Sequence, residues 1–102
     1  MNDWKWAGKP AHFVGSDDCK WHLTTHVGGY IVSSIGEYRP AHTDEMVPLD
    51  EFLTPLYYET FVFVAESESW EIGEELEGQR YSTADKATEG HMHYCHKWSK
   101  IH

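Results

Sequence analysis

Two pairs of residues that commonly bind metals stand far apart in this sequence. Cys19 and His22 form a Cys-x2-His pair, and His91 and Cys95 form a His-x3-Cys pair near the other end. Residues four apart on a helix lie on the same face. Structural zinc is commonly held by two such close pairs of thiolate and imidazole ligands from two elements. We therefore predict a structural zinc site made by these four residues, which would join a strand to a helix.

The same residues allow two other interpretations. Cysteine is often buried as a small apolar side chain, which needs no metal. Cys95 and His91 could instead form a reactive thiolate–imidazolium pair, so a metal- or cysteine-dependent hydrolase is a third hypothesis. No oxyanion-hole motif or phosphate-binding loop accompanies the pair, and we predict that the chain is not an enzyme.

One segment has the pattern of an amphipathic helix, and it carries His91 and Cys95. Ser82 is the expected N-cap, because its hydroxyl can accept a hydrogen bond from a free backbone N–H group. Apolar and aromatic residues then recur at spacings of three and four, the stripe of a helix that packs on an apolar surface. The stripe consists of Ala84, Ala87, His91, Tyr94 and Trp98.

The clearest β-strand signal is a predicted hairpin. Residues 21–27 and 30–35 are rich in β-forming residues and are separated by Gly28-Gly29, a typical two-residue hairpin turn. This register places Val27 opposite Tyr30, Thr25 opposite Val32, and Leu23 opposite Ser34. The segment 56–65 predicts a third strand with two apolar faces, and residues 70–72 could add an edge strand. Three prolines in 36–56 favour a long connection there.

These elements predict one α+β domain spanning residues 1–102. Its antiparallel sheet has three or four strands, and the C-terminal helix packs on one face. No apolar run is long enough to span a bilayer and no signal peptide is evident, so we expect a cytoplasmic protein that does not bind membranes.

Acidic residues are concentrated in one part of the chain. The net charge is −9, and the segment from Asp44 to Glu77 holds eleven acids without any lysine or arginine. The negative electrostatic field of this segment disfavours direct nucleic-acid binding and favours a cationic partner. The simplest interpretation is a solvated acidic loop that keeps the protein in solution. The alternative is a partner-binding surface, for which we name Glu66, Glu68, Trp70, Glu71, Glu74, Glu75 and Glu77.

The sequence also resembles a group of small bacteriophage and prophage proteins without an assigned activity. The resemblance rests on residues 18–28 with 30–38, on Tyr58-Glu59-Thr60-Phe61-Val62-Phe63, and on residues 90–92 with 95–98. Relatives carry a Cys-x-Cys-Gly element after the third strand, whereas this chain has Ala65-Glu66-Ser67-Glu68-Ser69-Trp70. The resemblance implies a phage product that acts in the host cytoplasm, where such proteins commonly bind and redirect a host protein.

Taken together, these patterns predict a non-enzymatic protein that binds a basic surface of a host protein through its acidic, aromatic-containing segment. Nucleic-acid mimicry and antagonism of host defence are two forms that this function could take. Zinc, if bound, would stabilise the fold. The alternative is a structural or regulatory zinc-binding domain in which the metal is essential to the function.

Overall fold

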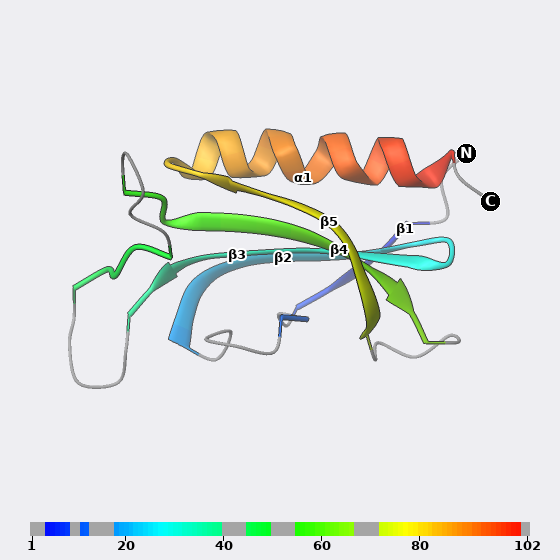
Figure 1. Cartoon of the computed structure of the whole chain (residues 1–102), viewed down its shortest axis with the longest axis horizontal. Coiled ribbons are helices and arrows are strands. Elements are labelled where there is room, and N and C mark those ends of the chain that lie inside the picture. Colours follow the sequence, from blue (N-terminus) through cyan, green and yellow to red (C-terminus); the bar gives the residue numbers. More distant parts are fainter. Residues whose placement is uncertain are drawn as a thin grey trace.

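A computed structural model of the chain describes residues 4–8, 11–12, 18–39, 45–49, 55–66 and 72–100. One antiparallel sheet has its strands in the order in which they occur in the chain, and one helix follows them. Figure 1 shows the helix lying lengthwise over one face of the sheet. The elements are β1 (Trp4–Ala7), β2 (Cys19–Val27), β3 (Tyr30–Tyr38), β4 (Tyr58–Ala65), β5 (Ile72–Tyr81) and α1 (Ala84–Ser99).

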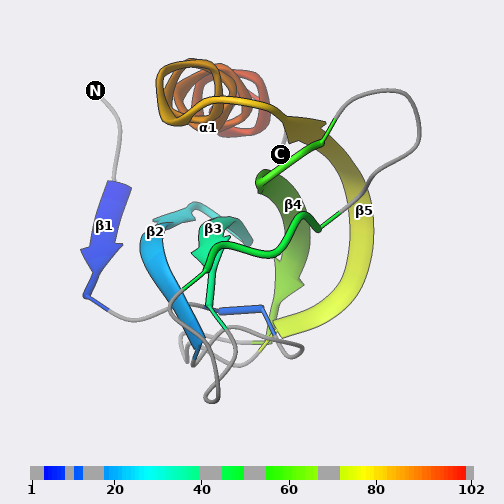
Figure 2. The same ribbon diagram turned by 90° about the vertical axis from the view of Figure 1, so that its left-hand side faces the viewer.

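This architecture confirms the predicted α+β fold with a C-terminal helix on an antiparallel sheet, although the sheet has five strands instead of three or four. The additional strand at one edge is β1, which pairs with β2 from Trp4↔Val27 to Ala7↔Thr24. Figure 2, an end view, shows the sheet curving so that β5 rises beside α1. No helix within the described residues is long and apolar enough to cross a membrane.

The β2–β3 hairpin has the predicted register. Val27 pairs with Tyr30, Thr25 with Val32, and Leu23 with Ser34. Gly28 adopts a φ of 58°, a left-handed conformation that glycine reaches without steric cost. The turn therefore fixes the register and, with it, the side chains that face the helix.

The segment that precedes the helix differs from the prediction. Residues 72–81 form a ten-residue edge strand, β5, in place of a short strand centred on 70–72. Trp70 and Glu71 lie outside the described residues. Glycine and glutamate are poor β-formers, but the apolar strand β4 supplies a partner along the whole segment, including Phe61↔Gly78. A Cβ atom at position 78 would collide with the Phe61 ring, so glycine lets that ring lie across β5.

The helix α1 begins one residue later than predicted. Thr83 is the N-cap, and its Oγ1 atom accepts a hydrogen bond from the Lys86 backbone N–H at 3.2 Å. The predicted Ser82 cap is therefore wrong by one position. The predicted stripe is largely confirmed, because the buried residues of the helix are Ala87, His91, Tyr94 and Cys95.

The two faces of the sheet are both buried but differ in composition. The face under α1 holds an apolar cluster of Val27, Val32, Val62, Tyr94 and Cys95. On the other face Ile31 and Ile35 are fully buried, together with polar Thr24 and Ser33. The face away from α1 therefore combines apolar and polar side chains, and both kinds are buried there. Much of the predicted 36–56 connection lies outside the described residues.

Candidate functional site

The structure does not bring the four predicted zinc ligands together. The Thr25 side chain points toward the helix, where it contacts His91. His22 is three positions from Thr25 in β2 and therefore lies on the opposite face of the sheet. Cys19 is six positions from Thr25, which is about 20 Å along a strand.

Only His91 and Cys95, on one face of α1, retain the predicted proximity. Among the residues that the structure describes, no group of three or more His, Cys, Asp or Glu side chains is arranged to hold a metal. Zinc binding stays a prediction, and the geometry of these four residues does not support it.

His91 is instead the centre of a buried network of hydroxyl groups. Its Nε2 atom lies 2.8 Å from Thr25 Oγ1, and its Nδ1 atom lies 2.7 Å from Ser34 Oγ. Ser34 Oγ is in turn 2.5 Å from Thr60 Oγ1. These hydroxyls come from three adjacent strands, so His91 connects α1 to β2, β3 and β4 at once.

The protonation states of this network are set by burial. Burial lowers the pKa of His91 to about 4, because surroundings shielded from solvent disfavour the charged imidazolium. Burial raises the pKa of Cys95 to about 11, against an opposing hydrogen bond from Thr25. The imidazole is therefore neutral and the thiol protonated near pH 7. A protonated, fully buried thiol is a poor nucleophile, so the geometry gives no support to catalysis by Cys95.

A second cluster, which the sequence did not indicate, lies on the face of the sheet away from α1. His12 Nδ1 is 2.7 Å from Ser33 Oγ, and His12 Nε2 is 3.2 Å from Glu59 Oε2, within ion-pair distance. Arg80 Nε lies 3.5 Å from the other Glu59 oxygen. The order of serine, histidine and acid resembles a catalytic triad, but Ser33 is fully buried and cannot meet a substrate. The cluster instead holds residues 11–12 against β3 and β4.

The predicted acidic surface divides into two kinds of glutamate. Glu74 and Glu75 are exposed on β5, and no ion pair engages them within the described part of the chain. Glu66 is exposed directly after β4, and its carboxylate lies over Gly73, where a Cβ atom would collide with it. We call Glu66, Glu74 and Glu75 the acidic edge. Glu68, Trp70 and Glu71 lie outside the described residues.

Glu77 is instead engaged by the helix. Its Oε1 atom accepts hydrogen bonds from Lys97 Nζ at 2.7 Å and from Trp98 Nε1 at 3.0 Å. The hydrogen bond from Lys97 is the largest of the effects that lower the pKa of this carboxyl. Glu77 therefore attaches the last turns of α1 to β5 and is a poor candidate for partner contact.

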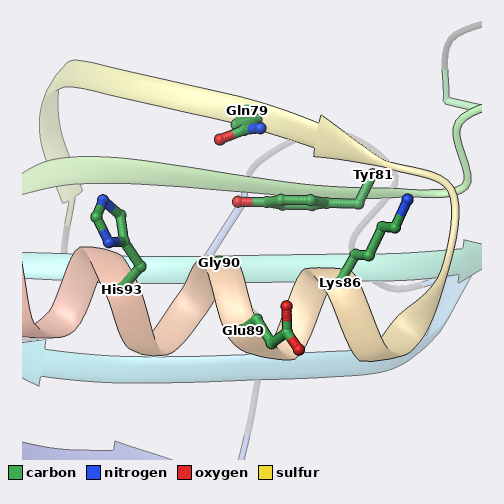
Figure 3. Close-up of a pocket in the computed structure, with 6 residues that line it drawn as sticks. All are labelled: Gln79, Tyr81, Lys86, Glu89, Gly90 and His93. Carbon is green, nitrogen blue, oxygen red and sulfur yellow. The ribbon is translucent and has the colours of Figure 1, made fainter.

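A groove runs between β5 and α1 near the start of the helix (Figure 3). Its volume is about 430 Å³, and Gln79, Tyr81, Lys86, Glu89, Gly90 and His93 line it. The sequence did not indicate that these residues line one groove. Their juxtaposition depends on the pairing of β5 with β4, which sequence periodicity did not reveal.

Comparison of the chain with protein-family models, with curated proteins and with solved structures finds no match. The function is therefore argued from the geometry of the molecule. The resemblance to phage proteins stays a prediction.

Proposed function

We propose that this chain is a non-enzymatic binding protein that acts on a host protein with a basic surface, through the acidic edge. The observation that supports the proposal is the contrast along β5. Glu77 has a cationic partner in Lys97, whereas Glu74 and Glu75 are exposed on the same outer strand without one in the described residues. Their charge is therefore available to an external cation.

The position of these acids also suits recognition. An edge strand offers backbone groups to another chain, and charged side chains on it limit pairing to complementary partners. β5 is the last strand of the sheet, and its neighbour within the sheet is β4. The negative field speeds encounter with basic surfaces and repels nucleic acid. Phage origin, inferred from the resemblance, supports a host protein as the target.

The other two hypotheses have less support from the geometry. A structural zinc domain requires ligands that meet, and His22 lies on the opposite face of the sheet from Thr25, which contacts His91. A cysteine hydrolase requires an accessible thiolate, and Cys95 is fully buried with a raised pKa.

The proposal can be tested with a fluorescent peptide of alternating arginine and valine, whose binding is followed by anisotropy over a range of salt concentrations. The double variant Glu74→Gln, Glu75→Gln should weaken binding roughly tenfold at low salt, since exposed ion pairs contribute up to about 1 kcal/mol each. The matched control is Asp85→Asn, Glu89→Gln, which removes the same two charges from exposed positions on α1.

Retention of binding by the α1 control supports a local acidic surface. Equal weakening by both double variants would show that only net charge matters and would overturn the proposal. Thermal unfolding of both variants should match that of the parent protein. Duplex DNA is then added to the complex of this protein with a captured host target. Displacement of the protein by the DNA indicates nucleic-acid mimicry, and its retention indicates another mode of binding.

A further inference from the structure

The groove between β5 and α1 contains a buried polar atom without a partner. Tyr81 is only 8% exposed, and among the described residues its hydroxyl oxygen has no partner in hydrogen-bonding geometry. The Thr60 hydroxyl lies close enough to lower the pKa of Tyr81, but burial dominates and the pKa is raised overall. The phenol is therefore neutral, and its O–H group is available as a donor.

The local structure holds this hydroxyl beside the helix backbone. Gly90 lies directly under the end of the Tyr81 ring, and a Cβ atom there would collide with the hydroxyl. In Figure 3 the ring lies between β5 and α1 with its hydroxyl directed along the helix. Burying an unpaired hydroxyl is unfavourable, and an acceptor on a ligand would remove that cost.

The groups around the hydroxyl have a common chemistry. Lys86 contributes an ammonium group, Gln79 an amide N–H₂, and His93 an imidazole N–H. Figure 3 shows Lys86 and His93 extending from α1 toward the strand side of the groove. Glu89 is the one acid among the lining residues, and its carboxylate points away from the Tyr81 hydroxyl in this view. Donors therefore outnumber acceptors around the unpaired hydroxyl.

From this arrangement we infer that the groove binds a small oxyanion, a carboxylate or phosphate group carried on a compact organic body. The Tyr81 hydroxyl and His93, which lies on the hydroxyl side of the ring in Figure 3, contact the anion, and the Lys86 ammonium, at the other end of the ring, adds a longer-range attraction. The volume of about 430 Å³ falls in the range of small-molecule sites and exceeds what a bare ion needs. This site is independent of the acidic edge.

Two-dimensional NMR titrations with phenyl phosphate, benzoate and inorganic phosphate at low ionic strength test the inference. We expect saturable shifts for the amides of residues 79–81 and 86–93 with at least one of the two aromatic anions, and weaker binding of inorganic phosphate. Tighter binding of phenyl phosphate or of benzoate identifies which oxyanion is preferred.

Three variants separate this site from adventitious binding. Tyr81→Phe keeps the ring and should weaken binding roughly fivefold to tenfold with little change in stability, because the hydroxyl has no partner in hydrogen-bonding geometry among the described residues. Lys86→Gln should weaken it by a smaller factor, because the ammonium lies at the other end of the Tyr81 ring, and Glu89→Gln should tighten it, because it removes a repulsive charge. Lys100→Gln, at the exposed end of the helix, is the matched control and should have no effect.

Three results would overturn the inference. They are the absence of saturable shifts with all three anions, shifts centred on Lys97 and Lys100, and equal affinities of the Tyr81→Phe variant and the parent. None of these results bears on the acidic edge, whose test uses a cationic probe.

Discussion

His91 Nε2 on the helix lies 2.8 Å from Thr25 Oγ1 on the sheet, in an interface that is otherwise largely apolar. Both residues are fully buried. A hydrogen bond of this kind adds directionality to helix packing, because the helix cannot slide or rotate without leaving a buried polar group unpaired.

Replacement of His91 should destabilise the protein strongly. His91→Ala removes the hydrogen bonds that the imidazole makes with Thr25 and Ser34, and it creates a cavity. We expect a loss of about 3–5 kcal/mol in the free energy of unfolding, measured by urea denaturation. His93→Ala, an exposed neighbour on the same helix, should change stability by less than about 0.5 kcal/mol. Equal effects at the two positions would contradict the network.

The stability of the protein should fall as the pH drops from about 6.5 to about 4. The pKa of His91 is about 4 in the folded state and 6.5 for an unperturbed histidine. Below pH 6.5 the unfolded chain binds a proton that the native state excludes, so stability declines until the folded-state pKa is reached. The contribution of His91 is about 3 kcal/mol over this range, at about 1.4 kcal/mol per pH unit.

The measurement is a series of urea unfolding curves between pH 4 and 8, made for the parent and for His91→Gln. The parent should lose more stability than the variant over this range. If the free energy of unfolding falls equally with pH in the parent and in the variant, carboxylates such as Glu77 account for the whole pH dependence.

Gly90→Ala should destabilise the fold, although alanine is the better helix former by about 1 kcal/mol. The added Cβ atom would overlap the Tyr81 ring, which must then move or push α1 away from β5. We expect a net loss of about 1–3 kcal/mol, the usual range for overpacking.

Calorimetric melting of Gly90→Ala, of Tyr81→Val and of the double variant measures the effect. Because valine lacks the ring, Gly90→Ala should cost less in the Tyr81→Val background than in the parent. Gly8→Ala, where no atom lies within 4 Å of the added Cβ, is the control and should be nearly neutral. A stabilised Gly90→Ala variant would mean that Tyr81 does not occupy the space above Gly90.

Glu77 and Lys97 should be energetically coupled, whereas Glu74 should not be coupled to Lys97. The Lys97 Nζ atom lies 2.7 and 2.9 Å from the two oxygens of Glu77. A double-mutant cycle with Glu77→Gln and Lys97→Met should give a coupling of about 0.5–1 kcal/mol, which high salt reduces. The parallel cycle with Glu74→Gln should give no coupling. A coupling that involves Glu74 would place that residue in the fold instead of on the acidic edge.

The parts of the fold that the sequence predicted correctly depend on local signals. Gly28-Gly29 sets the hairpin register, and the stripe from Ala87 to Tyr94 sets the buried face of the helix. The helix start was misplaced by one residue because Ser82 and Thr83 are both good capping residues, and propensity does not separate them.

The errors concern contacts between distant residues. β5 contains Gly73, Glu74, Glu75 and Gly78, whose low strand propensity is overcome by pairing with β4.

The zinc site lacks support for the same reason, because it too depended on contacts between distant residues. The Cys-x2-His spacing of Cys19 and His22 fits a zinc-ligand pair. Residues three apart in a strand point to opposite faces of the sheet, however, so His22 lies on the face away from the helix. His12 and Glu59 are far apart in the chain, and no periodicity links them.

The order of the elements along the chain has a consequence for synthesis on the ribosome. Each strand pairs with the strand made just before it, so the sheet can assemble progressively as the chain emerges. The helix that covers Val27, Val32 and Val62 is made after all five strands. Until α1 leaves the ribosome, the nascent sheet exposes this apolar face, which makes the interval between the synthesis of β5 and the release of α1 the time of greatest exposure to chaperones and to aggregation.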